Sequence, residues 1–200
     1  MPTKIIDLPR TSAAIKELAT ELVRYIKCEI TNKQSRVDWT WQNISLLDRF
    51  FGNRGCHRNF TASDAGTEFL WDFTAYIPYQ GMLLVAESEH DTRYESIAED
   101  FDKLLYSNAP LKLMMCRIDT RYGTQEAAKE ESEQICAKLE LNVQQNCANY
   151  SGGDVIIVYC VWWALPDGKN RDFAFLLQID GEPEHRDAKG KSFEPFKENV

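Results

Sequence analysis

Long apolar runs are missing from this 200-residue sequence, so no stretch approaches the roughly 18 residues that a membrane-spanning helix needs. The first residues, MPTKIIDLPR, also lack the apolar core of a secretion signal. The six cysteines show no CxxC pair or other spacing typical of a metal site. Scattered cysteines without a secretion signal are typical of reduced thiols, so we expect a cytoplasmic protein with no membrane partner.

An overall excess of basic residues is missing as well. The formal net charge of −8 argues against a protein that binds nucleic acid through a broad basic surface. Residues 33–58 are the exception, because five basic and two acidic side chains give them a charge of +3 and leave −11 for the rest of the chain. This segment is either a loop that happens to be basic or a surface that faces phosphate groups. In the second interpretation, Arg49, Arg54 and Arg58 would bind the substrate.

The hydrophobic spacing predicts alternating helices and strands in one domain. A chain of 200 residues with 44% hydrophobic side chains can bury a substantial core. In chain order, the patterns predict a helix over 12–30, a short helix over 44–51, a hairpin of TEFLWDFTAYIP and GMLLVAESE, a helix after Thr92, the strand LKLMMCRI, a helix over 124–141, and the strands DVIIVYCVWWAL and RDFAFLLQI. This order is typical of an α/β sandwich with a central mixed β-sheet flanked by helices. We expect a single domain over 1–200, with a polar tail over 181–200.

The hairpin would bring three carboxylates together. In LLVAESEH, side chains alternate between the two faces of the strand. Glu87 and Glu89 are therefore expected on the same face as Leu83 and Val85. If the hairpin turn has two residues, the numbers of paired residues sum to 159, so Asp72 lies opposite Glu87. Opposed residues have Cβ atoms roughly 4.5–5.5 Å apart on one face, so Asp72, Glu87 and, diagonally, Glu89 would converge.

Three converging carboxylates repel one another, so something must offset the repulsion. The alternatives are shared protons, basic partners, solvation at the sheet edge and a divalent cation. With solvation alone, the acids would simply keep a strand end soluble. With a cation, carboxylate oxygens that leave room for water suit Mg²⁺ or Mn²⁺, which can lower the pKa of a bound water and neutralise charge on a phosphate.

This arrangement resembles the PD-(D/E)XK superfamily of restriction endonuclease-like nucleases. A helix and a hairpin carrying Asp72 in WDF are followed, after 14 intervening residues, by Glu87-x-Glu89 in AESEH, and then by a helix and another strand. The resemblance covers about residues 12–118 and implies a restriction endonuclease-like α/β sandwich. It also implies that Asp72 and Glu87 bind Mg²⁺ (or Mn²⁺) and that Glu89 is a further metal ligand or the base for the attacking water.

The sequence departs from the superfamily's motif at Glu89, where a lysine is usual. Some restriction enzymes of the superfamily use Glu-x-Glu, and in other members the lysine comes from elsewhere, which makes Lys103 a candidate. The helical projection of residues 97–105, however, places Lys103 roughly opposite the buried face. There we expect it to pair with Glu99.

Arg117 is a second basic candidate. A crossover through a helix makes the LKLMMCRI strand parallel to the strand with Glu89, so Arg117 lies at the same end as Glu89. It would either hold a phosphate or form an ion pair with Glu89 or Asp119.

The leading hypothesis is a metal-dependent endonuclease that hydrolyses phosphodiester bonds in nucleic acid, with DNA as the favoured substrate. The alternative is a catalytically inactive nuclease-like fold that serves as a binding or regulatory protein; the missing lysine and the net charge of −8 favour it. No Ser/His or Cys/His spacing supports a triad hydrolase. The sequence leaves open whether the chain forms a homodimer.

Overall fold

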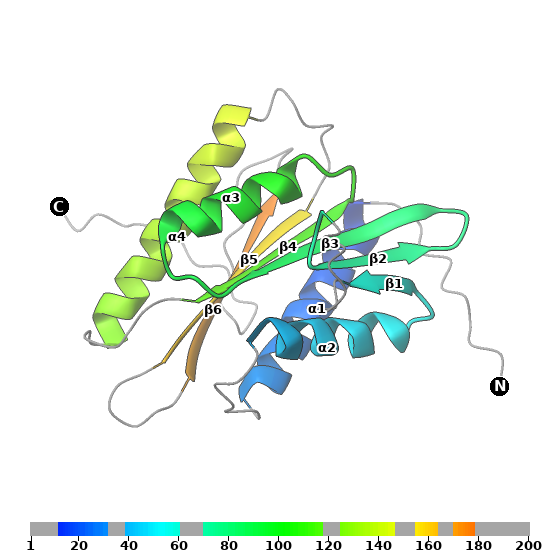
Figure 1. The fold of residues 1–200 in the computed structure, drawn as a ribbon, viewed down its shortest axis with the longest axis horizontal. Helices are drawn as coiled ribbons and strands as arrows, with labels where there is room; N and C mark the ends of the chain where they lie inside the picture. The colour runs from blue at the N-terminus through cyan, green and yellow to red at the C-terminus, as the bar shows by residue number, and fades with distance from the viewer. Residues whose placement is uncertain are drawn as a thin grey trace.

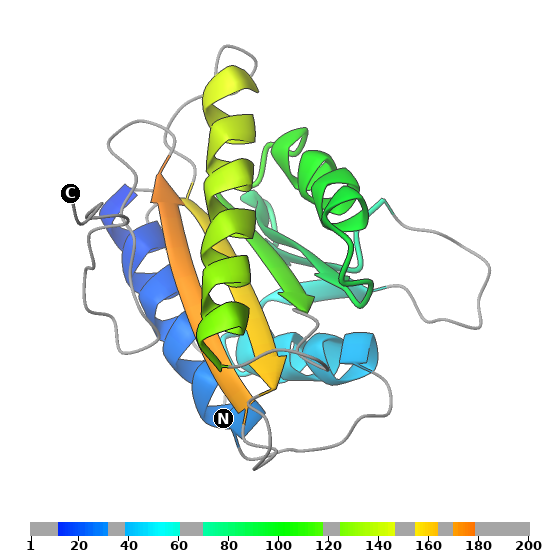
Figure 2. The ribbon, with the colours of Figure 1, turned by 90° about the vertical axis from the view of Figure 1, so that its left-hand side faces the viewer.

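The strands of the protein form one twisted sheet with helices on both sides (Figures 1 and 2). The structure is a computed structural model, and it describes residues 12–31, 39–60, 70–117, 125–146, 155–163 and 170–178. Within these ranges the elements are α1 (Ser12–Thr31), α2 (Trp39–Gly52), β1 (His57–Phe60), β2 (Phe73–Ile77), β3 (Gly81–Glu89), α3 (Tyr94–Leu105), β4 (Leu111–Arg117), α4 (Gln125–Asn146), β5 (Val155–Trp163) and β6 (Asn170–Gln178). The predicted tail over 181–200 and Asp119 lie outside the described residues.

The strands follow one another across the sheet in chain order, from β1 at one edge to β6 at the other. The first three strands are antiparallel, β3, β4 and β5 are parallel, and β6 is antiparallel to β5. A parallel pair needs a crossover connection, and α3 and α4 supply the two crossovers from β3 to β4 and from β4 to β5. The predicted α/β class, with a mixed sheet flanked by helices, is therefore confirmed.

The main difference from the prediction lies between α1 and the hairpin. There α2 begins at Trp39 rather than near Ile44, and β1 follows it in a segment for which no strand was predicted. Gly55 makes this possible, because its φ of 74° lies in the left-handed region that glycine adopts without steric cost. The Cys56 N–H then donates to Phe51 O and closes the turn. The hairpin thereby gains an antiparallel neighbour at the edge of the sheet.

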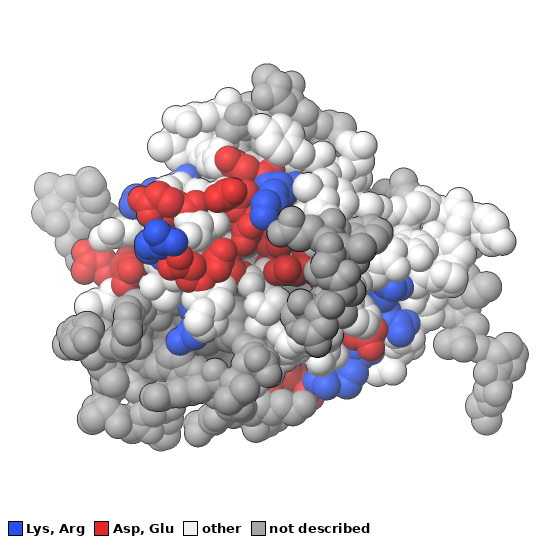
Figure 3. Space-filling model, viewed as in Figure 1, with Lys and Arg blue, Asp and Glu red and all other residues white. Residues whose placement is uncertain are grey.

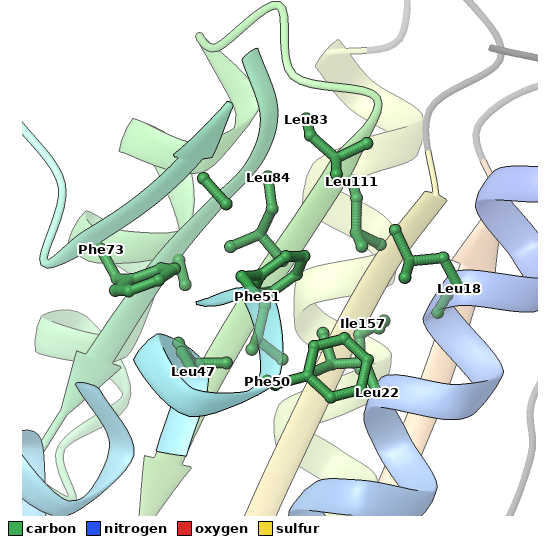
Figure 4. Close-up of a cluster of buried hydrophobic side chains, with 14 of the residues drawn as sticks. Leu18, Leu22, Leu47, Phe50, Phe51, Phe73, Leu83, Leu84, Leu111 and Ile157 are labelled. Carbon is green, nitrogen blue, oxygen red and sulfur yellow. The ribbon is translucent and has the colours of Figure 1, made fainter. Parts of the chain in front are cut away.

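Hydrophobic side chains fill both faces of the sheet. The helices α1 and α2 cover one face, where Phe50 and Phe51 pack with strand residues such as Phe73 and Ile157 (Figure 4). The helices α3 and α4 cover the other face, where Phe101 is fully buried. A sheet covered on both faces explains why β4 and β5 are almost continuously apolar. No helix in the described ranges is long and apolar enough to cross a membrane.

The β2–β3 hairpin has a longer turn than predicted, and a bulge compensates for it. Ile77 pairs with Gly81, so three residues form the turn instead of two. A bulge just before Tyr76 shifts the register by one residue, and Phe73 pairs with Ala86. The numbers of paired residues therefore sum to 158 beside the turn and to 159, as predicted, beside the acidic residues.

The bulge changes the direction of one strand residue. Leu83 and Leu84 both pack in the cluster beneath α1 and α2, so the prediction that Leu83 shares a face with Val85 is wrong. Regular alternation resumes afterwards, because Val85 packs with α3 and α4 whereas Ala86 packs with α1 and α2. The face on which Glu87 lies is therefore the one that α3 covers.

The turn of this hairpin provides a test of the backbone geometry. Gln80 N–H donates to Ile77 O over 3.0 Å, and Tyr79 has a φ of 64° while its side chain is fully exposed. For a residue with a Cβ, this left-handed backbone conformation is sterically unfavourable by roughly 1–2 kcal/mol. Tyr79→Gly is therefore expected to raise the free energy of unfolding by about 1 kcal/mol, measured by denaturant titration, because it removes strain without removing packing. Tyr79→Phe, which keeps the strain, should match wild type; a less stable Tyr79→Gly would contradict this turn geometry.

Candidate functional site

Two acidic side chains meet where β3 ends and β2 begins. Glu87 is 3% exposed and lies on the α3 side of the sheet, as Val85 does two residues earlier. Asp72 directly precedes β2, so the register that pairs Phe73 with Ala86 places Asp72 opposite Glu87. Their carboxyl groups are close enough to form a hydrogen bond and to shift each other's pKa. The structure thus brings together the two residues that the sequence predicts as the main metal ligands.

Ser88, the middle residue of the Glu-x-Glu sequence, is fixed by α2 from the opposite face. Its hydroxyl oxygen accepts a hydrogen bond from Asn43 Nδ2 over 2.7 Å, and its carbonyl oxygen accepts one from Thr40 Oγ1 over 3.2 Å. Its backbone N–H donates to Asp72 Oδ2 over 2.9 Å. The residue between the two glutamates therefore joins Asp72 to α2 and holds the end of β3 in place.

The helix α3 adds an acidic and a basic side chain that the sequence analysis did not assign to the site. Lys103 Nζ lies 2.6 Å from Asp100 Oδ1, and both side chains interact electrostatically with Glu87. The Lys103 side chain is 40% exposed, as the helical projection predicts, but its direct ion-pair partner is Asp100, and Glu99 acts on the ammonium group only as a nearby charge. The helical projection gives the direction of the Cα–Cβ bond, but the long lysine stem lies along the helix surface and carries the charge towards Asp100.

Burial and crowding raise the pKa values of the carboxyl groups. The pKa of Glu87 rises to about 9, mainly through burial and then through the charges of Asp72 and Asp100, while Lys103 acts in the opposite direction. Burial also raises the pKa of Asp72, an effect that the Ser88 N–H partly offsets. At neutral pH, Glu87 is therefore protonated. Of the ways to offset the repulsion, the fold uses a shared proton and a basic partner.

Glu89 lies at the more open edge of the same group. It is partly exposed, and its Oε1 accepts a hydrogen bond from Asp91 N over 2.6 Å. Burial raises the pKa of its carboxyl group, and the neighbouring Asp100 carboxyl acts in the same direction. We call Asp72, Glu87, Glu89, Asp100 and Lys103 the acidic cluster.

Asp72 and Glu87 offer the hard oxygen donors that Mg²⁺ and Mn²⁺ prefer. Glu87 Oε1 is buried without a hydrogen-bond partner, so this oxygen is available to bind a metal ion. No three histidine, cysteine or acidic side chains among the described residues are arranged to hold a metal ion. A divalent ion here would have at most these two carboxylates as protein ligands, so water or phosphate oxygens would have to fill its remaining positions. The predicted third ligand, Glu89, is not part of such a set in this conformation.

The arginines predicted to bind substrate lie on or beside α2, which covers the opposite face of the sheet. Each has an acidic partner: Arg49 pairs with Glu29 at 3.0 Å, Arg54 with Glu21 at 2.8 Å and Arg58 with Asp48 at 2.6 Å. In Figure 3, basic and acidic atoms lie together over α2, and over α3 acidic atoms outnumber the basic atoms that lie among them. The structure does not bring these arginines to the acidic cluster, and their role in substrate binding stays a prediction.

Arg117 lies at the end of β4, beside the end of β3, as the parallel topology predicts. Its Nη1 lies 2.7 Å from His90 Nε2. The arginine therefore contacts the residue that follows Glu89, and a phosphate contact stays a prediction.

Sequence reasoning missed Asp100 and set Lys103 aside. A usable signal was the i, i+3 spacing of an acid and a lysine at the side of the buried stripe of α3. Neither a protein-family model nor a curated protein sequence matches this chain.

The buried acid predicts a specific pH dependence of stability. Between the ordinary pKa of 4.5 and about 9, folded Glu87 holds a proton that the unfolded chain has lost, so stability falls as pH rises through this window. Glu87→Gln keeps the shape of the protonated acid and removes this titration. Without divalent cations, we expect its free energy of unfolding at about pH 8 to exceed that of wild type by roughly 1–3 kcal/mol.

Denaturant titrations across this pH range measure both the difference and its slope. Glu99→Gln makes the same chemical change at an exposed position of α3 and serves as the control. Equal stability of wild type and Glu87→Gln at about pH 8 would contradict a buried, protonated Glu87.

Proposed function

We propose that the chain is a metal-dependent nuclease that hydrolyses phosphodiester bonds in nucleic acid, with DNA as the first substrate to test. The observation that carries the proposal is the buried Glu87 carboxyl, which has an unused oxygen and lies beside Asp72. A buried, crowded pair of acids is a costly arrangement, and strongly shifted acids of this kind cluster at functional sites.

The order of elements supports this assignment. A helix, a hairpin with Asp72, the Glu87-x-Glu89 sequence, a crossover helix and a parallel strand follow one another in the order that the PD-(D/E)XK resemblance implies. This agreement favours a restriction endonuclease-like version of the α/β fold. It also removes one difficulty, because Lys103 offers the cation that the motif lacks at position 89.

Asp72 and Glu87 would hold the ion. When bound, a divalent cation lowers the pKa of a water molecule and neutralises charge on a phosphate. Lys103 would donate to a phosphate oxygen or orient the attacking water, and Asp100 keeps the ammonium group in place over 2.6 Å. Glu89, the more exposed acid, is the candidate base or further ligand.

The alternative is an inactive nuclease-like fold that binds or regulates a partner. The ion pairs of Arg49, Arg54 and Arg58 favour it, because they occupy the groups expected to contact phosphate. The lack of a three-carboxylate metal set in the described part of the chain favours it too. Both alternatives share the same fold, and activity measurements distinguish them.

Cleavage assays test the assignment directly. With Mg²⁺ or Mn²⁺, wild type is expected to cleave DNA, whereas Asp72→Asn, Glu87→Gln and Lys103→Ala each lose at least about a hundredfold in rate. The matched control is Lys138→Ala, which removes an exposed lysine whose Nζ lies 4.7 Å from the Tyr94 ring centre on α3. Failure of wild type to cleave either DNA or RNA would remove the nuclease assignment.

Metal binding should release a proton. Since the pKa of Glu87 is about 9, a cation that contacts this carboxyl near pH 7 must displace close to one proton, and its affinity must rise with pH. Calorimetry with Mn²⁺ in two buffers of different ionisation enthalpy measures the number of protons. Glu87→Gln should bind the ion more weakly and release none. Tight binding without proton release would show that the ion does not contact Glu87.

A further inference from the structure

Trp71 joins the two segments of chain that supply the acidic cluster. It directly precedes Asp72, and its indole Nε1–H donates to Lys103 O over 3.1 Å. Its ring is partly buried against the hydrophobic cluster of α3 and α4. One side chain therefore links the segment before β2, which carries Asp72, to α3, which carries Lys103.

The Trp71 N–H supplies a hydrogen-bond donor at a point where the helix needs one. The last four carbonyl groups of an α-helix have no partner within the regular hydrogen-bond ladder, and α3 ends at Leu105. Lys103 O belongs to this last turn, so the Trp71 N–H fixes the helix end at the residue whose side chain forms the ion pair with Asp100. The backbone anchor and the charged group belong to the same residue.

We propose that Trp71 is a positioning residue that keeps Lys103 at the acidic cluster by holding its backbone next to Asp72. This inference rests on the proposed function only for its effect on rate. Its effect on charge is independent of catalysis, because the Lys103 ammonium favours the ionised form of the neighbouring Glu87 carboxyl. The groups that face Glu87 are Asp72 beside it and Asp100 and Lys103 on α3, so a displaced lysine leaves only acids around it.

The decisive variant removes the N–H and keeps the aromatic ring. In Trp71→Phe, the pKa of Glu87, followed by ¹³C NMR of its carboxyl carbon, is expected to rise by roughly half a unit or more. If wild type cleaves DNA, kcat should fall about tenfold with KM unchanged, because the lysine is misplaced but the substrate surface is intact. In a Lys103→Ala background, Trp71→Phe should have no further effect on either quantity.

The matched control is Asn142→Ala. Asn142 Nδ2 donates to Asp102 Oδ1 over 2.5 Å, so this variant also removes one side-chain hydrogen bond to the last turn of α3, from α4 instead of from the site. It should leave the pKa of Glu87 and kcat as in wild type. Equal changes in both variants, or no change in Trp71→Phe, would overturn the proposal and leave Trp71 a packing residue.

A second variant covers the case in which Trp71→Phe does not fold. Replacing Trp71 with benzothienylalanine keeps the size and shape of the indole and exchanges only the N–H for sulfur. The same rise in the pKa of Glu87 is expected, and its absence would overturn the proposal. If wild type shows no cleavage, the nuclease assignment fails, whereas the NMR titration still decides the role of Trp71.

Discussion

The burial of the Glu87 carboxyl beneath α3 is the constraint on which the rest of the site depends. An ionised carboxylate that is shielded from water and has no partner is unfavourable by several kcal/mol, so the fold must supply a proton or positive charge. It supplies both: the pKa of Glu87 lies near 9, and Lys103 approaches from the neighbouring helix. Asp72 and Asp100 further disfavour the ionised form of Glu87, because their negative charges add to the effect of burial. The proton and the ammonium group together offset the unfavourable charge of these acids at neutral pH.

The pairing of Asp72 with Glu87 was predictable because side chains on a strand alternate with a period of two, and because the hairpin is local. The details of the hairpin were not predictable, since a three-residue turn and a bulge before Tyr76 replace the two-residue turn. The two deviations cancel at the end of β3. The stripe of Ile97, Phe101 and Leu104 likewise predicted α3, because burial of one helical face sets that spacing.

The contacts that sequence patterns could not predict involve long charged side chains and distant partners. Lys103 lies beside the buried stripe of α3, so its environment depends on what the sheet presents there. The partners of Arg49 and Arg54, Glu29 and Glu21, belong to α1, and nothing in the spacing of α2 points to them. The strand β1 is short and mostly exposed, so it has no alternating pattern to mark it.

One continuous stretch of chain, residues 72–103, supplies the whole acidic cluster. It contains the β2–β3 hairpin and the helix that follows it, and it brings the charged side chains of Asp72, Asp100 and Lys103 to Glu87. Contacts between residues close in sequence need little loop closure and form quickly. Parallel pairing of β4 with β5 must instead await the crossover through α4. We therefore expect the acidic cluster to assemble before the sheet is complete, with the long-range closure of the other half of the sheet as the slow step.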